Sequence, residues 1–405
     1  MLIVLVAAAV VVQLFVSATP PRSDSRSMEG MILLGWPDFW RFVPRTKTIA
    51  VSPTAEFTVA YRINTLGMRD RERDRAKTHN RHRIVFIGDS FTEGYGVPQD
   101  KAYPRSIEDL SDGRLECFNL GLRGMSPSFA YFRLQRLLDE GYQFDTVVLQ
   151  VFDNDFDDDV KHTDRFHLSI NPETQSIERD PFSRSSQRTK VFGPLAWPLS
   201  HVKLMWLLAS RFTNRPPKGE HASRFPLELA KSIRAVYENN YIAGVTVEDG
   251  GNGTAKISFP VISDKPLSVA AVDQLWCLLR DYNLSDRHDG HKRGVESVSD
   301  VITNPGHVKQ SLDYLGCIVA MAKQNHIPLL VVYQPSLPLI SRKNEDIFAE
   351  WCTQNNVPFM SLREHLRAVA LNSEQAVFFP IDGHLTAYGH QVVAEKLLGW
   401  INEHR

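Results

Sequence analysis

The sequence predicts an α/β protein with a central parallel sheet. Apolar runs of strand length alternate with helical patterns from residue 83 to 156, and again from residue 305 to 405. One run, Thr146–Phe152 (TVVLQVF), is almost uninterrupted, as expected for a strand buried on both faces. Strands that alternate with helices form parallel sheets with helices on both faces.

The expected elements of this sheet and its covering helices can be given in chain order. The strands are Ile84–Ile87, Cys117–Leu120, Thr146–Phe152, Ile327–Tyr333 and Val357–Leu362. The helices are Tyr103–Leu110, Ser128–Leu138, Val308–Gln324, Asn344–Gln354 and Ala387–Ile401.

Three segments lie outside this alternation. Residues 19–82 read as a linker followed by a small β-containing preface with one strand, Phe57–Ile63, and the charge run at 69–83 (RDRERDRAKTHNRHR) as a solvated connector. Residues 157–304 are too long for a loop and form an insertion. It holds two helix candidates, His201–Phe212 and the amphipathic Leu267–Asp281. The first would be a membrane-facing or acyl-binding lid, or simply part of the core.

The third segment is an apolar run at residues 2–18 (LIVLVAAAVVVQLFVSA), in which the polar side chains are Gln13 and Ser17. As a helix it spans about 25 Å, slightly less than a hydrocarbon core of about 30 Å. It fits a signal peptide cleaved after Val16-Ser17-Ala18 or a short uncleaved membrane anchor, with a buried helix as the alternative. We therefore expect the catalytic body outside the cytoplasm, as a secreted, periplasmic or membrane-anchored protein.

Charge and cysteine content exclude several classes. Lys and Arg number 46 against 47 Asp and Glu, a formal net charge of -1, and no basic stripe is interleaved with aromatics. Nucleic acid is therefore not an expected partner. The cysteines are widely separated without CxxC spacing, which excludes a disulfide-dense scaffold and a cysteine zinc site: they are Cys117, Cys277, Cys317 and Cys352.

The first motif, Gly88-Asp89-Ser90, follows a strand and precedes a helix. Catalytic groups collect at the carboxyl ends of parallel strands. Gly88 permits a tight turn, and Ser90 would lie where backbone N–H groups can stabilise an anion. The alternative is a plain turn. Asp89 is expected to brace the turn as a hydrogen-bond acceptor.

Two further motifs follow the next two strands. In Asn119–Gly124 (NLGLRG), a glycine at a strand end lets a substrate oxygen approach a backbone N–H, although an ordinary turn has the same pattern. In Phe152–Asp159 (FDNDFDDD), Asn154 can donate its side-chain N–H to an oxyanion. The acids there also suggest a cation site, but acids so close together repel, and a solvated loop is the interpretation we prefer; no metal is expected.

The fourth motif, Phe378–His390 (FFPIDGHLTAYGH), precedes the last helix. A serine nucleophile needs a general base, and the base needs an orienting carboxylate. His384 and Asp382 can supply both, whereas His390 falls inside the helix and is expected to be structural. A second Asp-Gly-His, at 289–291, lies in a polar loop with no preceding strand and is left out.

These four blocks, in this order, resemble those of the SGNH/GDSL hydrolase superfamily. The resemblance covers residues 83–156 and about 308–401, and it implies a flavodoxin-like three-layer α/β/α sandwich over 83–156 and 305–405. It places the nucleophile on Ser90, the base on His384, and the oxyanion donors on the Ser90 N–H, the Gly124 N–H and the Asn154 side chain.

The sequence departs from the family at two positions. The family often places its acid three residues before the histidine, where this chain has Ile381; a shorter Asp-x-His form also occurs, so Asp382 is assigned. The family often has glycine before the block-three asparagine, where this chain has Asp153, whose carboxylate would raise the pKa of the base or repel anionic substrates.

The resulting hypothesis is a serine-dependent hydrolase of ester bonds, acting on a small-molecule or glycan ester through an acyl-enzyme on Ser90, with no metal or organic cofactor needed. Two alternatives stay open. One is an O-acyltransferase that modifies an envelope polysaccharide. The other is a non-catalytic binding module that keeps the fold. The sequence does not indicate the oligomeric state.

Overall fold

The computed structural model describes residues 22–24, 32–33, 41–42, 44–77, 80–179, 221–251, 253–259, 266–285, 304–335 and 343–404. Its centre is a five-stranded sheet in which every neighbouring pair is parallel. The strand order is β15-β14-β8-β6-β7. The bounds are β6 (His82–Ile87), β7 (Leu115–Asn119), β8 (Thr146–Val151), β14 (Leu329–Tyr333) and β15 (Phe359–Ser361).

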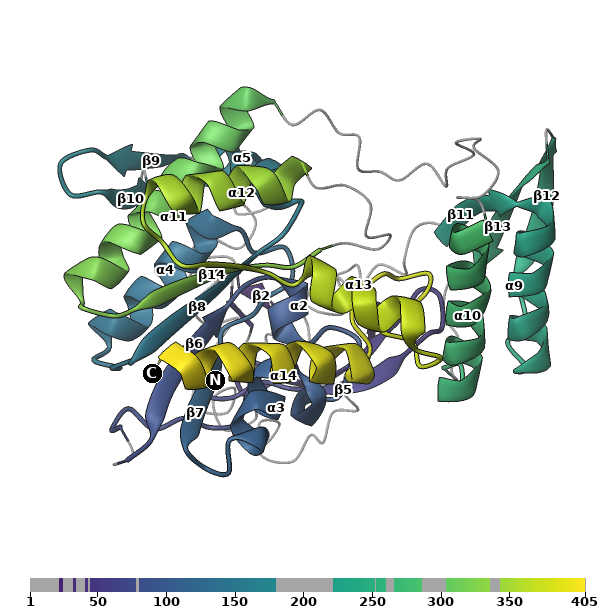
Figure 1. Cartoon of the computed structure of the whole chain (residues 1–405), viewed down its shortest axis with the longest axis horizontal. Helices are drawn as coiled ribbons and strands as arrows, with labels where there is room; N and C mark the ends of the chain where they lie inside the picture. The colour runs from purple at the N-terminus through teal and green to yellow at the C-terminus, as the bar shows by residue number, and fades with distance from the viewer. Residues whose placement is uncertain are drawn as a thin grey trace, which may run out of the picture.

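Helices cover both faces of the sheet (Figure 1). One face carries α4 (Pro127–Asp139), α5 (Asp155–Phe166), α11 (Pro305–Gln324) and α12 (Lys343–Gln354). The other carries α3 (Tyr103–Leu110), α13 (Arg363–Asn372) and α14 (Ala387–His404). In chain order the strands run 2-1-3-4-5, which is the flavodoxin-like arrangement. The predicted fold class is confirmed, and α13 is a helix that the sequence pattern did not predict.

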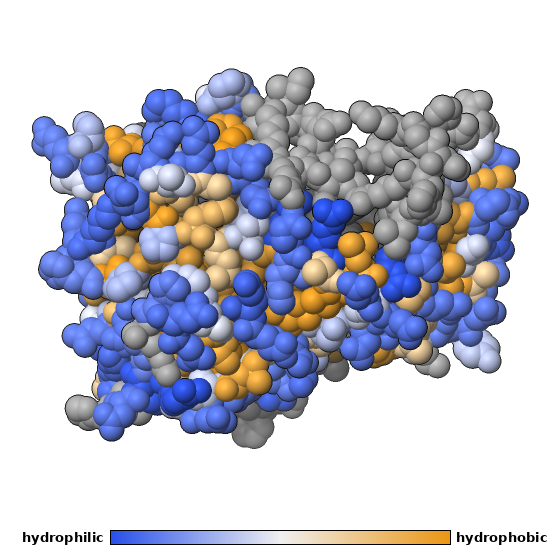
Figure 2. All heavy atoms as spheres, viewed as in Figure 1, coloured by the Kyte–Doolittle hydropathy of each residue, from blue (hydrophilic) through white to orange (hydrophobic). Residues whose placement is uncertain are grey.

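The sheet is built from strands without a polar face. Every residue of β8 and of β7 is buried, and so is β6 after His82. β6 lies between its two neighbours, with Ile84 in register with Cys117 of β7 and Thr146 of β8. On the face shown in Figure 2 the surface is mixed, with apolar areas between hydrophilic residues.

The preface is a set of short strands beside the sheet: β1 (Arg22–Asp24), β2 (Ile32–Leu33), β3 (Arg41–Phe42), β4 (Lys47–Val51) and β5 (Thr58–Arg62). β4 and β5 pair as an antiparallel hairpin. The turn between them, residues 52–57, ends in Phe57, whose ring packs 5.1 Å from that of Tyr95 and 5.0 Å from that of Phe379. The hairpin turn therefore contacts both the segment that follows Ser90 and the segment that precedes Asp382.

The charge run after the preface is only in part the solvated connector that we expected: Arg71, Glu72 and Lys77 are exposed, but several arginines are buried. Arg69 and Arg83 are fully buried, and Arg73 is 7% exposed. Arg69 donates to the carbonyl oxygens of Gly94 at 2.6 Å and Val97 at 2.5 Å. Burial is tolerated because the guanidinium groups find carbonyl and carboxylate acceptors inside the fold.

The part of the insertion described between residues 221 and 285 forms its own layer at one end of the molecule (Figure 1). An antiparallel sheet in the order β11-β13-β12 packs with two helices. The bounds are β11 (His221–Pro226), α9 (Leu227–Asn239), β12 (Thr246–Gly251), β13 (Thr254–Phe259) and α10 (Val269–Ser285). α10 matches the expected amphipathic helix. The hairpin β9 (Leu168–Asn171) and β10 (Ser176–Arg179) packs instead beside α4, α5 and α11.

α10 is fastened to the body just before the predicted Asp-His block. Trp276 Nε1 and Arg280 Nη1 both donate to the carbonyl oxygen of Ser373, at 3.3 and 2.7 Å. The backbone N–H of Ala376 donates to Asp273 Oδ1 at 2.8 Å. The insertion therefore contacts the segment that leads into the candidate site.

Two expected segments, the apolar run 2–18 and the helix candidate 201–212, lie outside the described residues, and the expectations about export and a lid stay predictions. Within the described ranges, no helix combines the length and apolar character needed to cross a membrane.

Candidate active site

Three of the sequence motifs meet at one edge of the sheet. The chain goes from β6 to β7 on one side and then returns to β8 on the other, so the strand order reverses at β6. Ligands bind outside the carboxyl ends of strands at such a reversal. Ser90 follows the end of β6, Gly124 follows β7, and Asn154 follows β8. The fold thus places all three after neighbouring strand ends.

Asp89 caps the short helix α2 (Ser90–Glu93) that begins at the candidate nucleophile. Its Oδ1 accepts the backbone N–H of Phe91 at 2.9 Å, which confirms the expected bracing role. Burial raises the pKa of Asp89 to about 7, while the Phe91 N–H and the charge of His384 act in the opposite direction. Asp89 is only 2% exposed, so its carboxyl serves the turn rather than the solvent side.

Gln150, the next-to-last residue of β8, supports the same turn with its side chain. Its Oε1 accepts the Asp89 N–H at 3.1 Å and the Thr92 hydroxyl at 2.9 Å. A Cβ on Gly88 would lie 2.3 Å from this oxygen, so only glycine leaves room for the Gln150 side chain. The glycine of the first motif is therefore required by packing against β8.

Ser90, His384 and Asp382 form a continuous chain of hydrogen bonds. Ser90 Oγ lies 2.7 Å from His384 Nε2, and His384 Nδ1 lies 2.6 Å from Asp382 Oδ1. A carboxylate can only accept, so Nδ1 carries the proton, and Nε2 of the neutral ring is left to accept from the serine hydroxyl. The His384 side chain is 25% exposed and Ser90 is half-buried, so the pair can be reached from outside.

A tight turn holds the histidine in place. Phe378 and Leu385 form an isolated antiparallel bridge, and within it Phe379 N donates to His384 O at 2.7 Å. The imidazole packs between aromatic rings, 4.9 Å from Phe91 and 4.5 Å from Tyr95. These contacts restrict the ring orientation, so that Nε2 faces the serine.

A carboxyl group from the preface lies under this turn, and the sequence analysis did not identify it. Glu56 Oε1 accepts the N–H of Ile381 at 2.9 Å, and its Oε2 accepts the N–H of Asp382 at 2.8 Å. Glu56 is 3% exposed. Burial, with a second contribution from the charge of Asp382, raises its pKa to about 8. No periodicity or motif distinguishes this residue in the sequence.

The second motif is packed against α2. A Cβ on Gly121 would lie 2.0 Å from the backbone nitrogen of Glu93, so the loop touches the α2 backbone directly. Glu93 Oε2 accepts the backbone N–H of Arg123 at 2.7 Å, and Oε1 accepts from Arg123 Nη2 at 2.5 Å. Burial acts to raise the pKa of Glu93, but Arg123 outweighs it and holds the pKa below its usual value. Gly124 follows with φ +67°, a conformation that favours glycine.

The third motif is a helix start rather than the solvated loop that we expected. Asn154 is the N-cap of α5, and Asp155 and Asp159 are buried, at 2% and 0% exposed. Acids are favoured in the first turn of a helix because of the helix dipole. Asn154 itself is exposed, and its Nδ2 donates to Asp158 Oδ2 at 2.9 Å. In the described ranges, no group of three or more His, Cys, Asp or Glu residues is arranged to hold a metal ion.

Asp153, which replaces the glycine common in the family, is hydrogen-bonded to a residue of β14. Its Oδ1 accepts the Tyr333 hydroxyl at 2.5 Å, and its carbonyl accepts Asn344 Nδ2 at 3.1 Å. The expected effect of its charge on the base stays a prediction.

Two other histidines have surroundings unlike that of His384. His390 lies in α14 at 1% exposure, accepts the Tyr103 N–H at 3.3 Å, and has its pKa lowered to about 3 by burial. His162 Nδ1 lies 2.8 Å from Ser126 Oγ, but both residues are buried, and that serine also donates to Asp159. Both histidines therefore belong to the packed interior.

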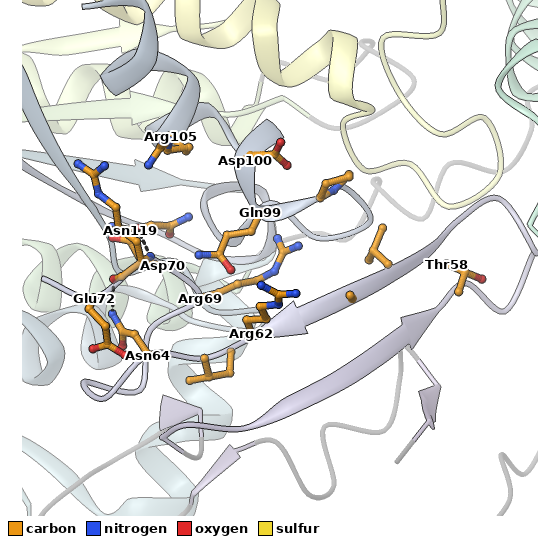
Figure 3. A pocket seen from close by; sticks show the side chains of 15 residues that line it. Thr58, Arg62, Asn64, Arg69, Asp70, Glu72, Gln99, Asp100, Arg105 and Asn119 are labelled. Carbon is orange, nitrogen blue, oxygen red and sulfur yellow. Dashed lines mark hydrogen bonds between the residues drawn. The ribbon is translucent and has the colours of Figure 1, made fainter. Parts of the chain in front are cut away.

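A hollow of about 710 Å³ lies apart from Ser90, His384 and Asp382, between β5 and the segment after it (Figure 3). Its charged lining includes Arg69, Asp70 and Arg105. Arg69 is held by backbone carbonyls, Asp70 accepts the Asn119 N–H at 3.1 Å, and Arg105 pairs with Asp109 at 2.8 Å. None of the predicted site residues lines the hollow, and we assign it no function.

The chain is similar to solved structures of lipolytic proteins. A protein described as lipolytic and of the G-D-S-L family, from Desulfitobacterium hafniense, has 10% sequence identity and a TM-score of 0.34, covering 78% of this chain and 98% of that one. A member of the lipolytic protein G-D-S-L family from Veillonella parvula has 10% identity and a TM-score of 0.35, covering 78% and 97%. The psychrotrophic esterase EstA from Pseudoalteromonas sp. has 10% identity and a TM-score of 0.33, covering 80% and 97%.

No family model matches the sequence, and no curated protein matches it. Because the identities and TM-scores are low, the functional proposal is based on the side chains of this chain and not on the activities of these proteins.

Proposed function

We propose that the chain is a serine-dependent hydrolase of carboxylic ester bonds that works through an acyl-enzyme on Ser90. The observation that carries the proposal is the pair of hydrogen bonds from Ser90 Oγ to His384 Nε2, at 2.7 Å, and from His384 Nδ1 to Asp382 Oδ1, at 2.6 Å. A serine hydroxyl is a weak nucleophile and needs an adjacent base, which in turn needs an orienting group.

The reaction follows from these positions. Ser90 Oγ attacks the ester carbonyl carbon while His384 Nε2 takes its proton. The tetrahedral intermediate collapses, and the alcohol leaves with that proton. Water then attacks the acyl-serine with His384 again as base, which releases the carboxylic acid and restores the hydroxyl. Asp382 accepts from Nδ1 throughout and stabilises the imidazolium.

The oxyanion of each tetrahedral intermediate needs hydrogen-bond donors. We assign this role to the backbone N–H groups of Ser90 and Gly124 and to the side-chain amide of Asn154. In support, the three residues follow the ends of adjacent strands β6, β7 and β8 at one edge of the sheet. Such donors, fixed before the reaction, contribute strongly to the rate.

The first test is covalent labelling with a fluorophosphonate probe, located by mass spectrometry. We expect the adduct on Ser90, and we expect Ser90→Ala and His384→Ala to abolish it. Ser126→Ala is the matched control, because Ser126 Oγ also lies 2.8 Å from a histidine nitrogen but is buried. It should leave the labelling unchanged. Folded protein that takes no label would reject the activated serine and favour a non-catalytic binding module.

Hydrolysis and transfer share the same acyl-enzyme and differ in the acceptor. We propose hydrolysis, on a small-molecule or glycan ester. The measurement is the partition of acyl groups from p-nitrophenyl acetate between water and an added oligosaccharide. Release of acetate at an unchanged rate supports hydrolysis. Acetylation of the sugar at the expense of free acetate would instead identify an O-acyltransferase.

A further inference from the structure

The segment that carries Asp382 has little regular structure of its own. It lies in the turn between Phe379 and His384, which is closed by two backbone hydrogen bonds, from Phe379 N to His384 O at 2.7 Å and from Gly383 N to Phe379 O at 2.8 Å. Neither bond involves the backbone N–H groups of Ile381 and Asp382. Those two groups point away from the turn closure and need acceptors elsewhere.

Both groups find the same acceptor. The two oxygens of Glu56 take them separately, Oε1 from Ile381 N at 2.9 Å and Oε2 from Asp382 N at 2.8 Å. This bidentate arrangement fixes two successive peptide groups, Pro380–Ile381 and Ile381–Asp382. Since the Cα that carries the Asp382 side chain directly follows the second group, the direction of its carboxylate toward His384 Nδ1 depends on the orientation of that group.

Glu56 is itself held by a network within its own turn. Thr54 Oγ1 lies 2.6 Å from Glu56 Oε2, and Ser52 Oγ lies 2.7 Å from Thr54 Oγ1. Hydroxyl groups can reverse their direction. If Glu56 is protonated, it can donate to Thr54, which then donates to Ser52. The two backbone hydrogen bonds from the Asp382 segment are therefore kept in either protonation state.

The turn is also fixed to the insertion. Tyr237 Oη, on α9, donates to the carbonyl oxygen of Thr54 at 2.8 Å, and Leu267 N donates to the carbonyl oxygen of Ala55 at 2.7 Å. Parts of the preface, the insertion and the Asp-His block thus meet around one buried carboxyl group. The preface and the insertion are therefore linked through hydrogen bonds to the Asp382–His384–Ser90 chain.

We propose that Glu56 is a positioning residue, which sets the orientation of the Asp382 carboxylate and through it the imidazole of His384. This inference rests on the proposed function, because it assigns Glu56 a part in the same reaction. Glu56 does not contact the serine or the substrate in this role. Substitution of Glu56 should therefore lower kcat and leave KM nearly unchanged, since a misplaced base slows the chemical step without weakening substrate binding.

The test compares Glu56→Gln with a matched variant, Glu116→Gln. Glutamine keeps the size but turns its amide NH2, a donor, toward one of the two backbone N–H donors. Glu116 is also a buried glutamate, 5% exposed and paired with Arg83 at 2.9 Å, but it lies near the amino end of β7, away from the Asp382 turn. Both variants replace a buried glutamate with its amide, so a merely structural effect should appear in both.

We expect Glu56→Gln to lower kcat for p-nitrophenyl acetate and the rate of fluorophosphonate labelling by about 10- to 100-fold, with KM little changed. Glu116→Gln should keep kcat and the labelling rate within about twofold of wild type. Its side chain is distant from Asp382, so the substitution leaves the orientation of Asp382 and His384 unchanged as long as the protein folds. A second readout is the low-field NMR resonance of the proton between His384 Nδ1 and Asp382, which should shift or broaden in Glu56→Gln alone.

The proposal is overturned if folded Glu56→Gln keeps the wild-type kcat and the wild-type resonance, or if Glu116→Gln changes them equally. Should Glu56→Gln fail to fold, Thr54→Val weakens the same network while keeping the carboxyl, and it should shift or broaden the resonance relative to wild type. If the wild-type protein itself takes no fluorophosphonate label, the proposed function fails. The resonance comparison still decides whether Glu56 orients Asp382.

Discussion

Gln150 Oε1 accepts the backbone N–H of Asp89 at 3.1 Å, so a side chain near the carboxyl end of β8 fixes the turn that follows the neighbouring strand β6. The same oxygen accepts the Thr92 hydroxyl at 2.9 Å. Gln150 is 4% exposed, and its Nε2 has no hydrogen-bond partner within the described residues. The side chain therefore acts through its oxygen, and it leaves one of its own buried donors unsatisfied.

Replacing that oxygen is expected to destabilise the protein. Gln150→Leu leaves the buried Asp89 N–H without its acceptor, which costs about 1–3 kcal/mol of the free energy of unfolding. It should also slow labelling of Ser90, because the turn loses its support from β8. The control is Gln391→Leu on α14, where the exposed side chain donates to Glu395; we expect a change within about 0.5 kcal/mol. Urea denaturation measures both, and equal midpoints would contradict the role of Gln150.

The assignment of Asp382 predicts a large effect of a small change. Asp382→Asn removes the carboxylate that holds His384 Nδ1–H, so the ring is free to present the wrong tautomer to Ser90. We expect kcat for p-nitrophenyl acetate to fall by about 10²- to 10⁴-fold with little change in stability. Asp313→Asn, at an exposed pair with Lys309, serves as the control and should retain activity. A loss below about tenfold would remove Asp382 from the proposed triad.

The buried ion pair between Glu93 and Arg123 should contribute more to stability than an exposed ion pair does. Glu93 is fully buried and also accepts the Tyr61 hydroxyl at 2.8 Å. Glu93→Ala leaves Arg123 buried without its carboxylate, and we expect a loss of about 3–5 kcal/mol in the free energy of unfolding. Asp109→Ala removes an exposed partner of Arg105 and should cost at most about 1 kcal/mol. Comparable losses in chemical denaturation would argue against a buried charge at Glu93.

The raised pKa of Glu56 predicts a pH dependence of stability with a definite sign. Burial first, and the charge of Asp382 second, raise this pKa from 4.5 to about 8. Between these values the folded state binds a proton that the unfolded chain has lost. The contribution of Glu56 is therefore fully present below about pH 4.5 and disappears as pH rises through about 8.

The measurement is the difference in free energy of unfolding between wild type and Glu56→Gln from pH 5 to 9. We expect the advantage of wild type to shrink by a few kcal/mol with rising pH, at about 1.4 kcal/mol for each pKa unit. The difference is needed because burial also raises the pKa of Asp89 to about 7 and of Asp159 to about 6, which gives slopes of the same sign. A pH-independent difference would mean that Glu56 titrates alike in both states.

The strand-end residues were within reach of sequence reasoning because each follows a recognisable local pattern. An apolar run that stops at Gly88 indicates both the strand and the turn, and Asp382 and His384 stand at the start of a helical pattern. The parallel arrangement then requires that such residues meet at one edge. The structure brings Ser90, His384 and Asp382 together, as that reasoning expected, and their catalytic roles stay a proposal.

The residues that support the site could not be predicted in this way. Glu56 and Gln150 act across long sequence separations; the apolar neighbours of Gln150 indicate that it is buried, but not which groups it binds, and nothing distinguishes Glu56 from an ordinary polar residue. Arg69 and Arg83 were misread because charge runs are usually solvated, whereas here the guanidinium groups reach internal carbonyl and carboxylate acceptors. The acids after β8 were misread because their repulsion was weighed without the helix dipole that favours them at the start of α5.

If Asn154 is an oxyanion donor, its substitution should lower activity without lowering stability. In this structure its amide donates to Asp158 Oδ2 at 2.9 Å, and its side chain makes no capping bond to α5. Asn154→Ala should therefore cost little stability but lower kcat by about 10²- to 10³-fold, the usual effect of removing one such donor. Asp158→Ala frees the amide without removing it, and it should lower kcat far less. Equal losses in the two variants would show that the helix start, rather than the amide, matters, and unchanged kcat in Asn154→Ala would leave the oxyanion to the backbone N–H groups alone.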